Sequence, residues 1–147
     1  MIDVAVQRSR ELFESGLFCA ESVLLAAAEG LGVNSDLIPR IASGVCSGLA
    51  RTGGLCGALS GALLVVGMGA GRDAADESIE PTYELVREVI RGFEARFGAT
   101  TCMGLTGCDL ATDEGQRAFR DRGQRALCTG YVGEATRMAL AALGKAN

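Results

Sequence analysis

Hydrophobic residues recur every three or four positions over most of the chain, and no segment alternates apolar and polar residues for long. This period is typical of α-helices that bury one side, whereas half-buried strands alternate with a period of two. The first helix is expected over residues 2–15, with Leu12 and Phe13 on its apolar side and Arg8 and Glu11 facing water. The pattern therefore predicts an all-α protein.

Glycine-rich and polar segments separate the remaining predicted helices. Helices are expected over about 19–29, 37–49, 56–70, 81–97, 101–105 and 128–143, with an arginine-rich helix inside 109–124 and a turn at 50–54. No linker, repeat or low-complexity block divides the chain. Residues 1–147 are therefore expected to form one domain, a single helical bundle.

The segment 52–71 carries no charge, and twenty residues are enough to span a bilayer. Its glycines include Gly57 and Gly61, four residues apart, a spacing also found where membrane helices dimerise. Seven of the twenty positions are glycine, however, which leaves too little Leu and Val for membrane insertion. We expect a glycine-rich central helix that is apolar all round because other helices surround it. The glycines leave a homodimer open as an alternative.

Composition excludes several classes of function. The chain has no histidine, and Lys145 is its only lysine, so it lacks the groups for a Ser-His or Cys-His nucleophile, a His-ligated metal or a phosphate-loop lysine. A net charge of -4 and a pI of about 4.9 argue against non-specific nucleic-acid binding. The N-terminal residues lack the basic start and apolar core of a secretory signal, so a cytoplasmic location is expected.

Six cysteines are the only soft ligands present in quantity. Four of them, Cys19, Cys56, Cys102 and Cys128, fall at or near the start of a predicted helix and begin an apolar stripe. Free N–H groups and the helix dipole stabilise anions at this position, so we expect these thiols to have lowered pKa values. We also expect the four sulfur atoms to face inward and meet in one centre.

Cys46 and Cys108 do not share this placement. Cys46 lies beside the apolar stripe of its predicted helix and Cys108 follows Gly107 in an apparent turn, so packing or an auxiliary thiol is expected for both. The spacing of all six contains no Cys-x-x-Cys, which excludes a thioredoxin-type motif, a zinc ribbon and a ferredoxin-type run.

Three kinds of chemistry stay open for the four cysteines. In the first, one thiolate attacks and a second cysteine resolves a reversible disulfide, and electrons pass to or from a partner protein. In the second, all four hold an iron–sulfur cluster that transfers single electrons. In the third, they form a structural Zn(Cys)4 site in a non-catalytic interaction module.

Two further side chains near the cysteines have both a chemical and a structural interpretation. Glu21 is placed to accept a proton from a thiol, but a carboxylate is also favourable in the first turn of a helix. Arg51 is placed to stabilise a thiolate or an anionic substrate, or is simply solvated. The arginines between 117 and 125 are interleaved with acidic residues, and a solvated helix face is expected for them.

Four segments carry a known cysteine pattern in order: FCAESVL at 18–24, GLCGALSGA at 54–62, CMGLTG at 102–107, and Cys128. They resemble the C_GCAxxG_C_C family of redox-active proteins over nearly the whole chain. The resemblance implies a small helical protein with four redox-active cysteines, and related domains of some cytochromes are associated with iron–sulfur binding. Cys46 and Cys108 depart from the four-cysteine pattern, which leaves open an extra disulfide or another ligand set.

Overall fold

The computed structural model describes residues 1–146, and every regular element in this range is helical. The all-α prediction is confirmed. The elements are α1 (Ile2–Glu14), α2 (Cys19–Leu31), the 3-10 helix η1 (Arg40–Val45), α3 (Ser47–Arg51), α4 (Gly57–Ala70), α5 (Glu80–Phe97), α6 (Cys102–Thr106), α7 (Asp113–Asp121) and α8 (Gln124–Ala146).

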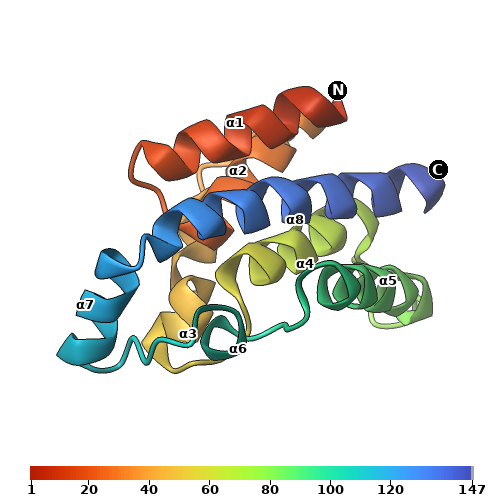
Figure 1. The fold of residues 1–147 in the computed structure, drawn as a ribbon. Helices are drawn as coiled ribbons and strands as arrows, with labels where there is room; N and C mark the ends of the chain where they lie inside the picture. The colour runs from red at the N-terminus through yellow and green to blue at the C-terminus, as the bar shows by residue number, and fades with distance from the viewer. Residues whose placement is uncertain (147) are drawn as a thin grey trace.

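The long C-terminal helix α8 connects the bundle, because it contacts α1, α2, α4 and α5. Figure 1 shows α1 and α8 running side by side, so that both chain ends lie at one end of the bundle. The short helices α3, α6 and α7 gather at the other end (Figure 1). The first residues of α2, α4 and α8 lie near these short helices, which places the predicted cysteine positions together.

The uncharged segment forms the central helix α4, which contacts α2, α5 and α8. Leu59, Val65 and Val66 are fully buried, while Leu63 and Leu64 are partly exposed. The predicted apolar core helix is therefore present. Among residues 1–146, no helix combines the length and the apolarity needed to cross a bilayer.

Glycines four residues apart let α4 lie directly against α2. A methyl group at Gly61 would be 2.9 Å from both the Cα and the carbonyl oxygen of Ala20, and one at Gly57 would be 3.0 Å from the Cys19 Sγ. Only a residue without a side chain permits this approach, which explains both glycines of the Cys-Gly-Ala-x-x-Gly segment. These glycine contacts lie within one chain and therefore do not support a homodimer. The homodimer stays a prediction.

The structure overturns the prediction of a helix over 37–49. Residues 40–45 form the 3-10 helix η1, and all five residues of α3 have positive φ, from 53° at Leu49 to 68° at Arg51. Pro39 lies inside the predicted helix and has no N–H to donate, and Gly44 and Gly48 weaken it further. The helical spacing of apolar residues extends through this segment, although its backbone does not form a regular α-helix.

The left-handed turn of α3 is held by hydrogen bonds to the chain on both sides. The Ala50 N–H donates to the Cys46 carbonyl oxygen at 2.8 Å, and the Gly54 N–H donates to the Gly48 carbonyl oxygen at 3.1 Å. Four of its five residues are not glycine, and each such residue costs roughly 1–2 kcal/mol in this conformation. The turn is therefore a strained element that the surrounding contacts maintain.

Replacing Gly61 should test the close approach of α4 to α2. We expect Gly61→Ala to lower the free energy of unfolding by about 1–3 kcal/mol, because the added methyl group meets backbone atoms of Ala20. Gly67→Ala on the same helix has nothing within 4 Å and should raise it by about 0.5–1 kcal/mol. Urea denaturation of the two variants measures both effects, and equal effects would contradict the proposed contact.

Replacing Ala50 should test the strain in α3. We expect Ala50→Gly to raise the free energy of unfolding by about 1 kcal/mol, because glycine adopts a φ of 60° without steric cost. The same exchange at the exposed helical residue Ala95 should instead lower it by about 0.5–1 kcal/mol. Thermal denaturation of both variants gives the two signs, and a loss of stability in Ala50→Gly would show that the turn is not strained.

Candidate redox site

Cys19, Cys56, Cys102 and Cys128 lie at or near the starts of four helices, and we call these four residues the thiol cluster. Cys19 and Cys102 are the first residues of α2 and α6, and Cys56 precedes α4. The predicted start of the last helix at about residue 128 is wrong, because α8 starts at Gln124 and places Cys128 in its second turn. The expected helix-entry position therefore holds for three of the four.

The pKa values of the four thiols depend on burial and on one another's charge. Burial is the main cause of the raised pKa at Cys19, Cys56 and Cys128, and a negative charge on Cys102 raises the pKa of each of them further. A charge on Cys19 likewise raises the pKa of Cys56 and Cys128. Cysteines distant in the sequence therefore influence one another's charge, and the convergence of all four sulfur atoms on one centre stays a prediction.

Backbone contacts fix two of the cysteines relative to each other. Leu55 and Thr101 form an isolated antiparallel bridge, in which the Cys56 N–H donates to the Thr100 carbonyl oxygen and the Cys102 N–H donates to the Gly54 carbonyl oxygen, both at 2.8 Å. This bridge joins the start of α4 to the start of α6. The positions of Cys56 and Cys102 are therefore set by the main chain.

Glycines also make room for the cysteine side chains. A methyl group at Gly48, in the left-handed turn, would lie 2.5 Å from the Cβ and 3.4 Å from the Sγ of Cys102. On the other side, the Gly57 position is in contact with Cys19. The strained turn α3 and the start of α4 thus enclose two members of the thiol cluster.

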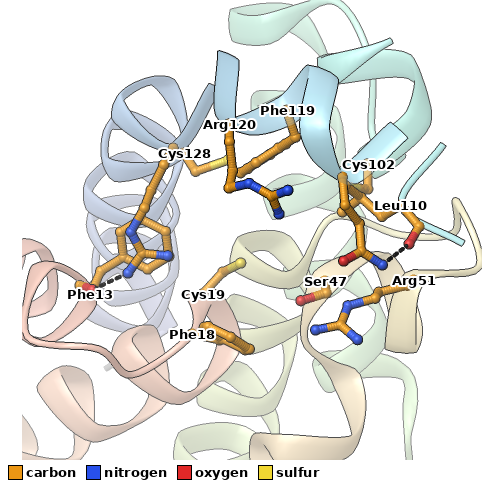
Figure 2. A pocket seen from close by; sticks show the side chains of 12 residues that line it. Phe13, Phe18, Cys19, Ser47, Arg51, Cys102, Leu110, Phe119, Arg120 and Cys128 are labelled. Carbon is orange, nitrogen blue, oxygen red and sulfur yellow. Dashed lines mark hydrogen bonds between the residues drawn. The ribbon is translucent and has the colours of Figure 1, made fainter. Parts of the chain in front are cut away.

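The thiols surround a small open cavity. Cys19, Cys102 and Cys128 are half-buried and line a cavity of about 160 Å³, whereas Cys56 is only 6% exposed and does not line it. Figure 2 shows the Cys19 and Cys128 side chains directed toward this space. We call it the thiol cavity. Three thiols are accessible from it, and the fourth is buried outside its lining.

The expected lowering of the pKa values is wrong, because burial outweighs the helix N-termini. Burial raises the pKa of all four thiols above the ordinary range of cysteine, and it raises the pKa of Cys56 to about 12. The N–H groups act in the predicted direction but are weaker. At Cys19, the backbone N–H of Ser47 and the residue's own N–H offset part of the desolvation.

Three arginines face the thiol cavity, and two of them were expected only on a solvated helix face. The cavity is lined by Arg51 from α3, Arg120 from α7 and Arg125 from the start of α8. The charge of Arg125 lowers the pKa of Cys19 and Cys128 against the larger effect of their burial. Helical spacing alone did not reveal Arg120 and Arg125, because their orientation depends on how α7 folds against the bundle.

Other residues near the cluster have structural roles. Glu21 accepts hydrogen bonds from the Phe18 N–H at 2.9 Å and the Ser43 hydroxyl at 2.7 Å, so its carboxylate secures the start of α2. Cys46 and Cys108 are 4% and 2% exposed, and each thiol contacts a backbone carbonyl oxygen at 3.4 Å. These contacts match the packing role expected for the two additional cysteines.

Sequence analysis missed Tyr131, which lies one helical turn beyond Cys128. Burial raises the pKa of its hydroxyl, and charges on Cys128, Cys56 and Cys102 raise it further. Its ring contacts Phe97 edge to face, with ring centroids 4.8 Å apart. The spacing of three residues from Cys128 was the available signal for this placement.

The donor set contains only soft thiols, the kind of ligand that zinc and iron–sulfur clusters take. As the side chains lie, however, residues 1–146 contain no group of three or more cysteine, aspartate or glutamate residues that could hold one metal ion. The cysteine side chains would therefore have to move closer together before they could hold either zinc or an iron–sulfur cluster.

The cysteine pattern also identifies the family. No curated protein and no solved structure matches the chain significantly. The family model described as "Putative redox-active protein (C_GCAxxG_C_C)" matches residues 17–142, which include the whole thiol cluster. The chain therefore belongs to the C_GCAxxG_C_C family.

Proposed function

We propose that the protein is a thiol–disulfide redox protein whose reaction takes place at the thiol cavity. The observation that carries this proposal is the grouping of three half-buried thiols around one cavity, with a fourth thiol buried outside its lining. One accessible thiol is enough to attack a disulfide, and a neighbour is needed to complete the exchange. The site supplies both.

Cys19 is the attacking residue in this proposal. Its thiolate is stabilised by the Ser47 N–H, its own N–H and the charge of Arg125. It attacks one sulfur of a disulfide substrate, forms a mixed disulfide and releases the first substrate thiolate, which takes up a proton from water. Cys102 or Cys128 then attacks the Cys19 sulfur, and the second substrate thiol leaves. In sum, one disulfide is reduced to two thiols while two protein thiols become one disulfide.

Regeneration of the reduced protein needs a dithiol reductant, and a redox partner protein is our proposal for it. A cytoplasmic location is part of the same proposal, because cytoplasm keeps thiols reduced between turnovers. The deeply buried Cys56 does not line the cavity and takes no part in the two exchange steps. The main chain holds it beside Cys102.

An iron–sulfur cluster is the second candidate, supported by the predicted convergence of four thiols from four helices. Four cysteines are the usual ligand number for such clusters. In that case, Cys19, Cys56, Cys102 and Cys128 would hold it, and the protein would transfer single electrons. Anaerobically purified protein with visible absorbance and stoichiometric iron would favour the cluster, and stoichiometric zinc would favour a structural site.

Thiol counting tests the disulfide proposal directly. We expect metal-free reduced protein to lose two thiols, without a retained adduct, when it reacts with the neutral disulfide bis(2-hydroxyethyl) disulfide. Cys19→Ser should slow this loss by about tenfold or more, because the thiolate is the nucleophile. Replacing the resolving residue, Cys102→Ser or Cys128→Ser, should instead trap a mixed disulfide on Cys19. Mass spectrometry after alkylation distinguishes these products.

Cys108→Ser is the matched control for this experiment, because Cys108 is buried and does not line the cavity. It should behave like the unaltered protein. If Cys19→Ser lost thiols at the normal rate, the assignment of the attacking residue would be wrong. If the unaltered protein kept all its thiols, the disulfide proposal itself would fail.

The raised pKa values predict a loss of stability at alkaline pH. Unfolded cysteines ionise near 8.5, whereas the folded thiols keep their protons to higher pH, so the folded state binds more protons in this range. The free energy of unfolding of reduced protein should therefore fall as the pH rises above about 8.5. Urea denaturation at pH 8 and pH 10 measures the fall. Cys56→Ala should reduce it, since the pKa of Cys56 is raised to about 12, and an unchanged slope would contradict this cause.

A further inference from the structure

The thiol cavity concentrates positive charge in an acidic protein. The whole chain has 14 basic and 18 acidic residues, yet the cavity is lined by three arginines and by no aspartate or glutamate. Arg51, Arg120 and Arg125 come from three different helices. Figure 2 shows the guanidinium groups of Arg51 and Arg120 facing the cavity from opposite sides. Like charges gathered around a concave site attract an anion into it.

These three arginines also have unused hydrogen-bonding capacity. The ion pairs found within residues 1–146 involve Arg8, Arg87, Arg137 and Lys145, and none of the three cavity arginines. Arg125 is fixed in place, because its guanidinium donates to the Phe13 carbonyl oxygen at 2.6 Å and lies 4.1 Å from the centre of the Phe13 ring. A guanidinium has five N–H donors, so free donors are left to bind a carboxylate.

The size and lining of the cavity restrict which anions can bind in it. At about 160 Å³ it is smaller than the usual 300–1,000 Å³ of cavities that take drug-sized ligands. Phe18, Leu110 and Phe119 add apolar surface between the arginines and the thiols. This combination suits a short carbon chain with a carboxylate at one end and sulfur at the other.

We propose that the thiol cavity recognises small organic disulfides that carry carboxylate groups, with Arg51 and Arg120 as the carboxylate-binding residues. This proposal rests on the proposed function and specifies its substrate class. The carboxylate contacts the arginines, and the disulfide lies toward Cys19 and Cys128. Exchange then follows the two steps given above: the Cys19–substrate bond replaces the substrate disulfide, and a protein disulfide replaces the Cys19–substrate bond. Two carboxylate-bearing thiols leave.

Three disulfides of similar size and different charge test this recognition. They are 3,3′-dithiodipropionate with two carboxylates, bis(2-hydroxyethyl) disulfide without charge, and cystamine with two ammonium groups. Each rate constant is divided by that of the same disulfide with free cysteine, which removes the difference in intrinsic reactivity. We expect the protein to prefer the dicarboxylate, and we expect added salt to weaken this preference because salt screens partly exposed charges.

Variants that remove the charges of Arg51 and Arg120 test whether these residues cause the preference for the dicarboxylate. Arg51→Gln combined with Arg120→Gln should lower the rate with the dicarboxylate by roughly three- to tenfold, because two partly exposed charge contacts are lost. The same variant should leave the neutral disulfide within about twofold and raise the rate with cystamine. Arg117→Gln is the matched control, since Arg117 is exposed on α7 and does not line the cavity. Arg125 is left unchanged because it also contacts Phe13.

The outcomes distinguish failure of the proposed anion recognition from failure of the proposed redox function on which it rests. If the neutral disulfide oxidises the protein but the dicarboxylate has no advantage, the anion recognition is wrong and the redox function stands. An equal fall in the rates with all three small disulfides in the double variant would also overturn the anion recognition. A faster reaction with a protein disulfide than with any of the three small disulfides would overturn it as well. If no disulfide reacts, calorimetry with suberate, an unreactive analogue of the dicarboxylate, still tests the site. Binding that the double variant loses would support it, and no binding would overturn it.

Discussion

The close approach of α4 to α2 is the contact on which the rest of the site depends. At Gly61 there is no space for a methyl group against the backbone of Ala20, and at Gly57 a methyl group would press tightly on the Cys19 side chain. This approach brings the start of α4, and with it Cys56, next to the start of α2. The small residues of the Cys-Gly-Ala-x-x-Gly segment are thus needed for the packing of α4 against α2. This packing in turn positions the cysteines for their chemistry.

Two opposing effects act on the cysteines, and burial is the stronger. Helix N-termini and nearby N–H groups favour the thiolate, but the half-buried positions remove more hydration than these groups restore. A raised pKa protects the thiols from indiscriminate reaction at neutral pH, because the thiol is a poor nucleophile. Nearby positive charge, as at Arg125, then becomes important for any thiolate that does form.

Local sequence patterns predicted the regular helices well, because amphipathic periodicity and glycine or proline ends are local properties. The helix α5, with its proline in the first turn, is an example. The same reasoning failed around Pro39, where an apolar stripe continued through a segment that cannot form an α-helix. It also failed to find Arg120, Arg125 and Tyr131, because the direction of these side chains depends on how α7 and α8 pack. The shared cavity of Cys19, Cys102 and Cys128 agrees with the prediction from their residue type and pattern, while a single centre formed by all four cysteines stays a prediction.

The contact between Cys19 and the backbone at Gly57 also determines the direction in which a group bound to this sulfur can extend. The start of α4 closes one side of the Cys19 side chain, and the Ser47 amide of the left-handed turn occupies another. Space for additional atoms lies on the side of the cavity that Cys19 lines. A group bound to the Cys19 sulfur therefore extends into this cavity, so the shape of the cavity affects which molecules are able to react.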